Sequence, residues 1–187
     1  MTAQSTRRAV VPSWLRIRGY RPGDHVAVVQ LNRYGLAAAR VPPGGDAYPG
    51  DLDDDAAVYR REGAALLVGE RDGVVVAMGA VVPVHTVVPG PGVRTCELRR
   101  MRVDPAYQGR GYGRAMLVAL EEFALQCGYG RAVLLTGAEQ HPAVDLYRSA
   151  GYVECGREQC GPLPQVRLAK DLLARDLAQG AVAQPDC

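Results

Sequence analysis

Three glycines alternate with other residues in the stretch Gly109-Arg110-Gly111-Tyr112-Gly113-Arg114, and this spacing suits the binding of an anion. Glycine adopts positive φ easily and has no Cβ, so a bulky anion can approach the main-chain amides. The arginines at positions 110 and 114 add guanidinium donors for phosphate-like oxygens. A glycine-rich connection without a ligand is the alternative that this short pattern leaves open.

A helix is predicted directly after these glycines. Apolar residues recur at the spacing of one helix face from Arg114 to Cys127, and Gly128 follows as a left-handed stop. These apolar residues are Met116, Leu120, Phe123 and Cys127. The first amides of a helix have no acceptor within the helix, and the helix dipole adds partial positive charge there. The sequence therefore predicts an anion site where this helix begins.

Two familiar phosphate-binding loops do not fit the stretch. A P-loop requires Gly-Lys-Ser or Gly-Lys-Thr, which the sequence does not contain. The Rossmann fingerprint requires a glycine where Arg114 stands, and its first glycine follows the strand directly. Here residues 104–108 lie between the predicted strand and Gly109. A different kind of anion-binding loop is therefore expected.

The strand predicted before the glycines has a conflict of phase. Cys96 and Leu98 are apolar at even positions, whereas Met101 and Val103 are apolar at odd positions. Because side-chain direction alternates with period two, a straight strand cannot place both pairs on one face. A bulge at residues 99–100 resolves the conflict and would leave main-chain amides available to a ligand. The alternative is a strand that is buried on both faces at one end.

Two motifs of the chain stand in an order and at a separation that are typical of one family. The first is Gln108-x-x-Gly111-x-Gly113, five residues after Val103. The second is Ala143-x-x-Leu146-Tyr147-x-x-x-Gly151-Tyr152. They resemble the acetyl-CoA pyrophosphate loop and the later helix and strand of the GNAT superfamily of N-acetyltransferases. The resemblance covers about residues 15–172, and its diagnostic motifs lie within residues 97–152.

The resemblance implies a role for each candidate residue. Glu97 stands at the general-base position of the central strand, and Tyr147 would protonate the sulfur of coenzyme A. The Met101 amide would polarise the acetyl carbonyl, and the Val103 main chain would align the pantetheine arm. The other residues implied in binding acetyl-CoA are Arg102, Gln108, Gly109, Arg110, Gly111, Tyr112, Gly113, Arg114 and Gln140. Gln140 stands where many family members have asparagine.

The chemistry of amine acetylation explains why such residues are needed. An acceptor amine of the lysine type has a pKa of about 10.4, so about one molecule in 2,500 is neutral at pH 7, and a base or water relay is valuable. Attack on the thioester builds negative charge on the carbonyl oxygen, which a preorganised amide can stabilise. The leaving thiolate benefits from a proton donor such as a phenol.

Each candidate side chain also has a plainer explanation. Glu97 can be a solvated carboxylate on a strand. Tyr147 shares a helical stripe with Ala143, Leu146 and Ala150, which is typical of a core aromatic residue. The aspartates of residues 51–55 could attract a cationic substrate, but they can equally favour the start of a helix through its dipole.

Composition sets the outer bounds of the interpretation. With 187 residues, of which 48% are hydrophobic, we expect one domain over residues 14–175, a disordered lead over 1–13 and a flexible tail over 176–187. A net charge of +2 gives no argument for nucleic acid or an acidic membrane, and no apolar run approaches the roughly 20 residues of a membrane span. The five cysteines lack metal-type spacing, so we expect no metal and reduced thiols in the cytoplasm.

The remaining pattern predicts an α/β fold with a mixed (α+β) sheet. Strands are expected at 15–21, 64–70, 74–82, 94–103, 132–136, 152–160 and 166–169. Asp72-Gly73, between the second and third of these, predicts a two-residue hairpin. Helices are expected from Asp24, whose side chain is placed to cap the helix, to about Tyr34, from Leu52 to Glu62, from Arg114 and from His141. Antiparallel strands come first, and a strand-helix-strand crossover follows. The resemblance implies a GNAT-like fold, with a central sheet of six to seven strands and about four helices.

The resemblance therefore implies an N-acetyltransferase that moves an acetyl group from acetyl-CoA directly to a primary amine of a small molecule or peptide. A non-catalytic acetyl-CoA-binding sensor or interaction module of the same fold is the alternative. Both would bind the donor, and only the enzyme would release thiol in the presence of an amine. The identity of the acceptor cannot be read from the sequence, and a homodimer is left open.

Overall fold

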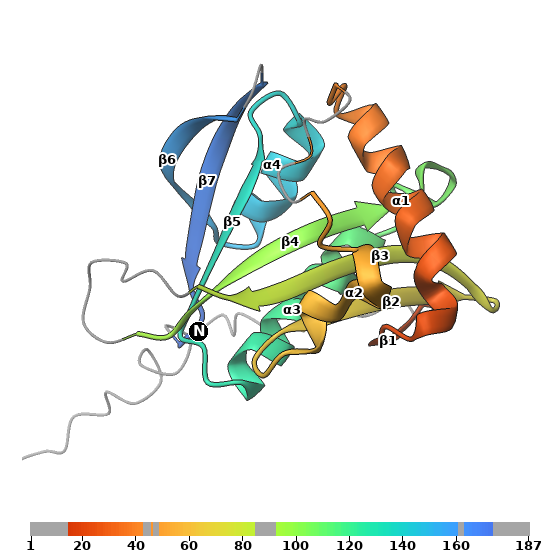
Figure 1. The fold of residues 1–187 in the computed structure, drawn as a ribbon. Helices are drawn as coiled ribbons and strands as arrows, with labels where there is room; N and C mark the ends of the chain where they lie inside the picture. The colour runs from red at the N-terminus through yellow and green to blue at the C-terminus, as the bar shows by residue number, and fades with distance from the viewer. Residues whose placement is uncertain (1–14, 43–45, 47–48, 85–92, 161–162, 174–187) are drawn as a thin grey trace, which may run out of the picture.

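The computed structural model of the chain describes residues 15–42, 46, 49–84, 93–160 and 163–173. Its strands form one seven-stranded sheet in the order β1-β2-β3-β4-β5-β7-β6 (Figure 1). The strands are β1 (Arg16–Gly19), β2 (Ala65–Arg71), β3 (Val74–Pro83), β4 (Thr95–Val103), β5 (Arg131–Gly137), β6 (Val153–Cys160) and β7 (Leu163–Asp171). The α-helices are α1 (His25–Ala38), α2 (Asp53–Ala56), α3 (Tyr112–Gln126) and α4 (His141–Ser149). Short 3-10 helices are η1 (Pro22–Asp24), η2 (Ala57–Arg60) and η3 (Pro105–Tyr107).

The sheet has the mixed topology that the sequence predicts. Strands β1 to β4 pair antiparallel in chain order, and β4 then pairs parallel with β5 across the connection made by α3. Strand β7 lies antiparallel between β5 and β6. The hairpin predicted at Asp72-Gly73 is confirmed, because both residues have positive φ, 50° and 81°, and the register closes on Arg71 and Val74.

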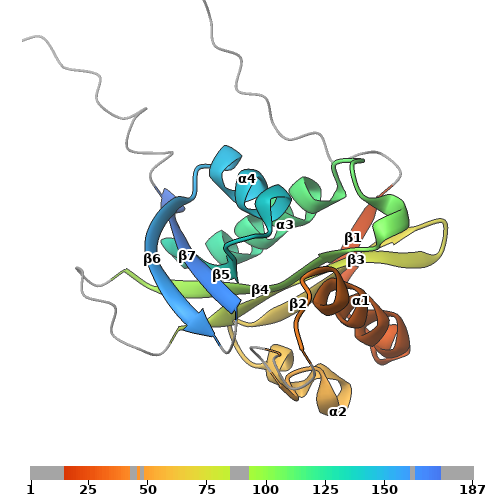
Figure 2. The ribbon, with the colours of Figure 1, turned by 90° about the horizontal axis from the view of Figure 1, so that it is seen from above.

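Helices cover both faces of the sheet (Figure 2). Helices α3 and α4 lie on one face, where Met116, Leu120 and Tyr147 pack on strands β3, β4, β5 and β7 in the larger core cluster. Helix α1 and the α2 segment lie on the other face, where Val28 and Leu31 join a second cluster with β2 and β3. The central strand β4 therefore runs between two helical layers.

The predicted number of helices is slightly too high. Within the described ranges, three α-helices exceed one turn, and the helix expected from Leu52 to Glu62 is reduced to α2 followed by η2. Ala56 interrupts it with a left-handed φ of 57°. Leu52, Ala56 and Tyr59 are all buried in the second core cluster, so tertiary packing overrides the local helical preference.

Asp24 was expected to cap the first helix, and this expectation is wrong. Its side chain makes no capping hydrogen bond to α1. Instead Asp24 Oδ2 accepts hydrogen bonds from the Arg21 amide at 2.8 Å and from Arg18 Nη1 at 2.7 Å. The hydrogen bond from Arg18 is the main reason that the pKa of Asp24 lies below its usual value. The carboxylate therefore stabilises the turn before α1 rather than the helix itself.

We predict that Asp24→Asn lowers the free energy of unfolding by about 2 kcal/mol near neutral pH, because charged hydrogen bonds are lost. The folded-state pKa of Asp24 is lowered, so its contribution is complete above the unfolded-state pKa and is lost as the pH falls through the folded value. Denaturant titrations at several pH values should show the difference between the two proteins shrinking as the solution becomes acidic. A difference that is independent of pH would contradict the pairing with Arg18.

Candidate active site

The bulge predicted in the central strand is present. Ala80 pairs with Arg99 and Met78 pairs with Arg102, so Gly79 of β3 faces two residues of β4, Arg100 and Met101. Arg100 has a left-handed φ of 55°, which is uncommon for a residue other than glycine.

The bulge solves the conflict of phase in the way the sequence predicts. Cys96 and Leu98 before it, and Met101 and Val103 after it, all contribute to the core cluster beneath α3. Without the extra residue, the second pair would turn to the α1 face. The bulge therefore keeps the apolar side of β4 continuous while it displaces the main chain at one point.

A cleft opens where β4 and β5 separate. Their parallel register runs from Thr95 with Arg131 to Leu98 with Leu134, and continues no further. The residues that line this β4–β5 cleft include Arg99, Met101, Arg102, Thr136, Gln140 and Tyr147. Neither β3 nor β5 has a residue in register with Met101 within the described strands. The main chain at Met101 thus borders the cleft outside the regular ladder.

The alternating glycines occupy the turn between β4 and α3. Gly109 and Gly111 have φ of 74° and 82°, and a Cβ added to either would meet nothing within 4 Å. Gly113 differs, because it lies inside α3, where an added Cβ would come within 3.3 Å of Leu146. Two of the glycines therefore serve the conformation and openness of the loop, and the third serves close packing of α3 on α4.

Within the part of the chain that the structure describes, the main-chain amides of this loop lack hydrogen-bond acceptors, as the sequence predicts for the start of a helix. Among the described residues, no acceptor is found for the amides of residues 109–114, and the first bond of α3 runs from the Ala115 amide to the Gly111 carbonyl at 3.0 Å. The loop is exposed from Gln108 to Gly111. Unsatisfied amides at an exposed helix start are suited to an anion with several oxygens.

Side-chain contacts hold the loop between β4 and α3 in place. Gln108 Nε2 donates to the Val103 carbonyl at 3.1 Å, and this bond closes the turn after β4. The Arg110 guanidinium lies 5.4 Å from the ring centroid of Tyr107, and Arg114 donates to the Ser149 hydroxyl on α4. Tyr112 is buried, and its hydroxyl accepts a hydrogen bond from Arg71 at 2.7 Å. Tyr112 is one of the residues predicted to contact acetyl-CoA, and with its side chain buried it can offer only its main chain to a ligand.

Tyr147 reaches the cleft from helix α4. Its side chain is 6% exposed and packs edge-on against Tyr152, with the ring centroids 5.8 Å apart. Burial raises the pKa of Tyr147 to about 12, and the charge of Arg102 lowers it in part. The phenol is therefore protonated at neutral pH, as a proton donor must be. Gln140 precedes α4, and its side-chain oxygen accepts a hydrogen bond from Thr136 at 3.4 Å.

The Glu97 carboxylate, predicted to be the general base, is engaged in an ion pair on β4. Glu97 precedes Arg99 by two residues on the same face of β4, and its Oε2 accepts hydrogen bonds from Arg99 Nε at 2.8 Å and pairs with Nη2 at 2.6 Å. Arg99 is among the residues that line the cleft. Glu97 is not itself among those residues, so the structure connects its carboxylate to the cleft through the ion pair with Arg99.

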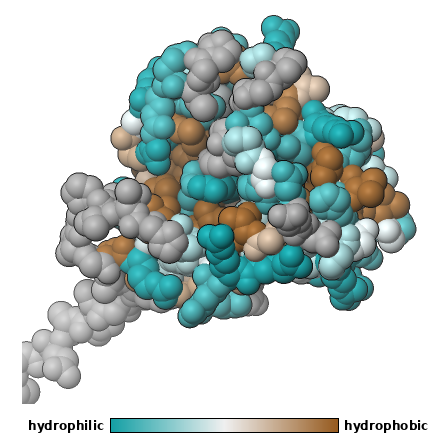
Figure 3. Space-filling view, in the orientation of Figure 1, coloured by the Kyte–Doolittle hydropathy of each residue, from teal (hydrophilic) through white to brown (hydrophobic). Residues whose placement is uncertain are grey.

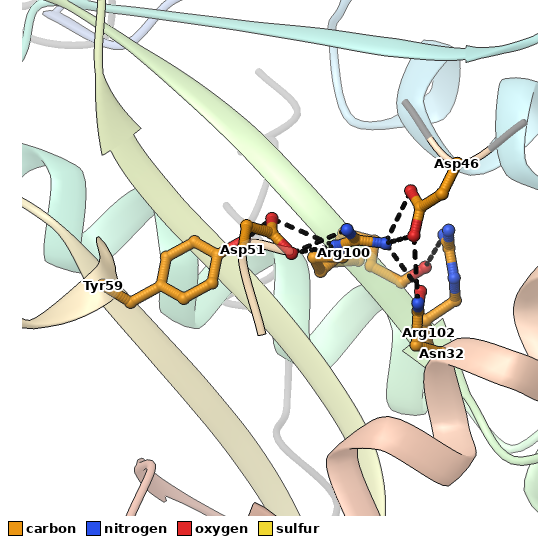
Figure 4. Close-up of polar contacts among 7 residues, drawn as sticks. Asn32, Asp46, Asp51, Tyr59, Arg100 and Arg102 are labelled. Carbon is orange, nitrogen blue, oxygen red and sulfur yellow. Dashed lines mark hydrogen bonds and ion pairs between the residues drawn. The ribbon is translucent and has the colours of Figure 1, made fainter. Parts of the chain in front are cut away.

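The most extensive polar cluster at the site was missed by sequence reasoning. Arg100, at the bulge, bonds to Asn32, Asp46 and Asp51 (Figure 4). Asp51 was expected either to attract a cationic substrate or to favour a helix start, but its carboxylate is engaged by Arg100 and Tyr59. The predicted bulge was the one sequence signal that pointed to Arg100.

Two further properties of the described residues are relevant to the class of site. They contain no group of three or more His, Cys, Asp or Glu side chains that could hold a metal ion. Their helices include none that is long and apolar enough to cross a membrane. On the face drawn in Figure 3, separate apolar patches lie among hydrophilic residues.

Comparison with known sequences identifies related proteins. The acetyltransferase (GNAT) family model matches residues 35–152. The chain is 32% identical over 106 residues to N-acetyltransferase family 8 member 2 of Rattus norvegicus, covering 57% of this chain and 46% of the rat protein. It is 32% identical over 134 residues to the uncharacterized N-acetyltransferase YjgM of Escherichia coli, covering 69% of this chain and 76% of that protein. The chain thus spans about half the length of its rat relative.

Solved structures share the fold. The yncA protein of Salmonella typhimurium, whose structure includes acetyl-CoA, has a TM-score of 0.70 at 22% identity, covering 94% of this chain and all of that one. A ribosomal-protein-alanine N-acetyltransferase of Brucella melitensis has a TM-score of 0.68 at 24% identity, covering 83% of this chain and 99% of that one. At this level of identity the comparison bears on the fold, and it confirms the predicted architecture.

Proposed function

Because the chain belongs to the acetyltransferase (GNAT) family, we propose that it transfers an acetyl group from acetyl-CoA to a primary amine of a small molecule or peptide. The observation that carries the proposal is the run of unsatisfied amides at residues 109–114, opened by two left-handed glycines. Such amides fit the two phosphates of coenzyme A, and Arg110 and Arg114 lie in the same stretch to add positive charge. The acetyl-CoA in the yncA structure supports the same donor.

The residues of the cleft suit the acyl end of that donor. When bound, acetyl-CoA supplies the thioester that an amine attacks. The Met101 amide, outside the regular ladder, is proposed to donate a hydrogen bond to the carbonyl oxygen as negative charge develops there. Val103 would align the pantetheine arm, with its carbonyl already held by Gln108. Arg102 and Gln140 line the same cleft and are proposed to contact the arm.

Proton transfer is assigned to two side chains. The acceptor nitrogen forms a bond to the acetyl carbon as the bond from that carbon to sulfur breaks. Tyr147 donates its phenolic proton to the departing sulfur, and Glu97, directly or through water, takes the proton that the amine loses. Supplying a neutral amine of the lysine type at pH 7 costs about 4.6 kcal/mol, which explains the value of a base. No covalent intermediate with the enzyme is involved.

The proposal is tested by a thiol-release screen. The full chain is incubated with acetyl-CoA and a panel of amines, amino acids and aminoglycosides, and free thiol is measured by a colorimetric reagent. We expect thiol release that depends on at least one amine and equals the amount of acetylated product found by mass spectrometry. Binding of acetyl-CoA without amine-dependent release from any member of a broad panel would favour the sensor alternative.

The role of Glu97 is tested by comparing two variants of its ion pair. We predict that Glu97→Gln lowers kcat about 10- to 100-fold and removes one limb of the pH–rate profile, because the proton acceptor is lost. Arg99→Met also breaks the pair but leaves the carboxylate, so it should retain that limb. Full pH profiles with a saturating amine measure both. Equal losses in the two variants, with unchanged profiles, would reduce Glu97 to a structural partner of Arg99.

A further inference from the structure

The guanidinium of Arg100 lies in a closed cluster of polar side chains. Its side chain is 1% exposed. Nη1 bonds to Asp46 Oδ2 at 2.8 Å and Asn32 Oδ1 at 2.8 Å, and Nη2 bonds to Asp51 Oδ1 at 2.6 Å. Tyr59 in turn donates its hydroxyl proton to Asp51. Figure 4 shows Asn32, Asp46 and Asp51 around the one guanidinium, with Tyr59 on the other side of Asp51.

The cluster joins the central strand to three separate parts of the opposite layer. Asn32 belongs to α1, Asp46 lies between α1 and α2, and Asp51 lies just before α2. Asp46 also lines the β4–β5 cleft, together with Ala39 and Val41, which directly follow α1. The hydrogen bonds and ion pairs of Arg100 therefore join the α1–α2 side of the cleft, which contains Asp46, to strand β4.

The main chain of Arg100 is itself unusual. Its φ of 55° is left-handed, and side chains other than glycine, asparagine and aspartate seldom adopt that conformation. A residue keeps such a conformation where contacts with the surrounding structure hold it in place. Here two carboxylates hold the far end of the side chain, and the next residue along the strand is Met101, whose amide borders the cleft.

We propose that Arg100 is a positioning residue for acetyl transfer. Its ion pairs to Asp46 and Asp51 hold the bulge of β4 so that the Met101 amide points at the acetyl carbonyl, and they fix the wall at Asp46 against which the acceptor lies. The inference rests on the proposed function. Arg100 is among the residues that line the cleft, but its guanidinium is 1% exposed and is held by Asn32, Asp46 and Asp51, so it acts through these contacts and not on the reacting atoms.

Two substitutions separate the effect of the main chain from that of the side chain. Arg100→Met removes the ion pairs and leaves a residue that disfavours positive φ. Arg100→Gly removes the same pairs but adopts positive φ without strain. We expect Arg100→Met to lower kcat about 100-fold, as for the loss of an oxyanion donor, and Arg100→Gly to recover about 10-fold of that loss while its KM for the amine stays raised. The Kd for acetyl-CoA should change less than about threefold in both variants, because most affinity comes from the phosphate loop.

A matched control measures the effect of losing any buried ion pair. Lys170 bonds to both oxygens of Glu121 at 2.6 and 2.7 Å, and the two side chains are 11% and 12% exposed. We expect Lys170→Met to lower the melting temperature and to leave kcat within about twofold, because this pair lies between β7 and α3, outside the cleft. Should Arg100→Met prove too unstable to purify, Asp51→Asn removes one of the two carboxylate charges and should lower kcat by about 3- to 10-fold.

A second readout does not depend on turnover. The chain has four methionines, so selective labelling with 15N-methionine gives a simple spectrum in which the Met101 amide can be assigned. Exchanging coenzyme A for acetyl-CoA should shift the Met101 amide in the wild type, leave it unmoved in Arg100→Met and shift it again in Arg100→Gly.

The inference is overturned if Arg100→Met keeps wild-type kcat, or if Arg100→Gly is as slow as Arg100→Met and the Met101 shift is the same in all three proteins. Failure of the proposed function itself would appear separately, as wild-type protein that releases no thiol with any amine. In that event the amide shift still decides whether Arg100 controls the bulge.

Discussion

Replacing Tyr147 by phenylalanine should lower kcat about 100- to 1,000-fold, because the general acid for the departing thiolate is removed. The affinity for acetyl-CoA should stay within about twofold of wild type, since the ring that packs against Tyr152 is retained. Steady-state kinetics give kcat, and calorimetry with acetyl-CoA gives the affinity. A loss in kcat without a loss in binding is the expected signature of a group that acts in the transition state.

The pH dependence sharpens this prediction. Because burial raises the pKa of Tyr147 to about 12, the phenol keeps its proton at lower pH and loses it only as the pH rises through that value. With the usual pKa of about 10, ionisation of the phenol would lower the rate between pH 8 and about 10.5. With the raised pKa of Tyr147, the wild-type rate should not decline over this range for that reason. Tyr152→Phe is the control, since Tyr152 contacts the Tyr147 ring from the core. Wild-type turnover in Tyr147→Phe over the whole pH range would refute the assignment.

Replacing Gly111 by valine should weaken the binding of coenzyme A by at least about 100-fold. Gly111 has a φ of 82°, which a β-branched residue can adopt only under strain. Relief of that strain would reorient the unsatisfied amides of residues 109–114, and the valine methyl groups would occupy the open space beside Gly111. Calorimetric titration with coenzyme A measures the loss.

The chain provides a close control for this substitution. Gly73, in the hairpin between β2 and β3, has a φ of 81°, and a Cβ added there also meets nothing within 4 Å. Gly73→Val therefore imposes a similar backbone strain outside residues 109–114, and it should lower stability without changing the affinity for coenzyme A. If Gly111→Val binds coenzyme A as tightly as Gly73→Val, the glycine loop is not the phosphate site.

Local patterns in the sequence predicted much of the site. The bulge followed from the apolar phase of Cys96 and Leu98 against Met101 and Val103, because the period of a strand is fixed by its geometry. The open turn followed from glycine spacing, and the hairpin at Asp72-Gly73 followed from residues that tolerate positive φ. Each of these features depends on neighbours within a few residues.

The features that were missed depend on residues far apart in the chain. The partners of Arg100 are Asn32, Asp46 and Asp51, at sequence separations of 68, 54 and 49 residues. No local pattern brings these groups together, so only the packing of α1 and the α2 segment on β4 reveals them. The break at Ala56 has the same origin, because burial of Tyr59 in the second cluster overrides helical preference.

Calorimetric titration of the full chain with coenzyme A, and in parallel with acetyl-pantetheine, tests most directly whether the residue 109–114 amides bind a diphosphate. We predict saturable binding of coenzyme A at one site per chain. Binding of acetyl-pantetheine, which lacks the diphosphate together with the phosphorylated adenosine, should be weaker by about 100-fold or more, in line with the loss of several charge-assisted hydrogen bonds. Absence of heat with coenzyme A at millimolar concentration, or equal affinity for the two compounds, would contradict the assignment of this loop and of the transferase activity built on it.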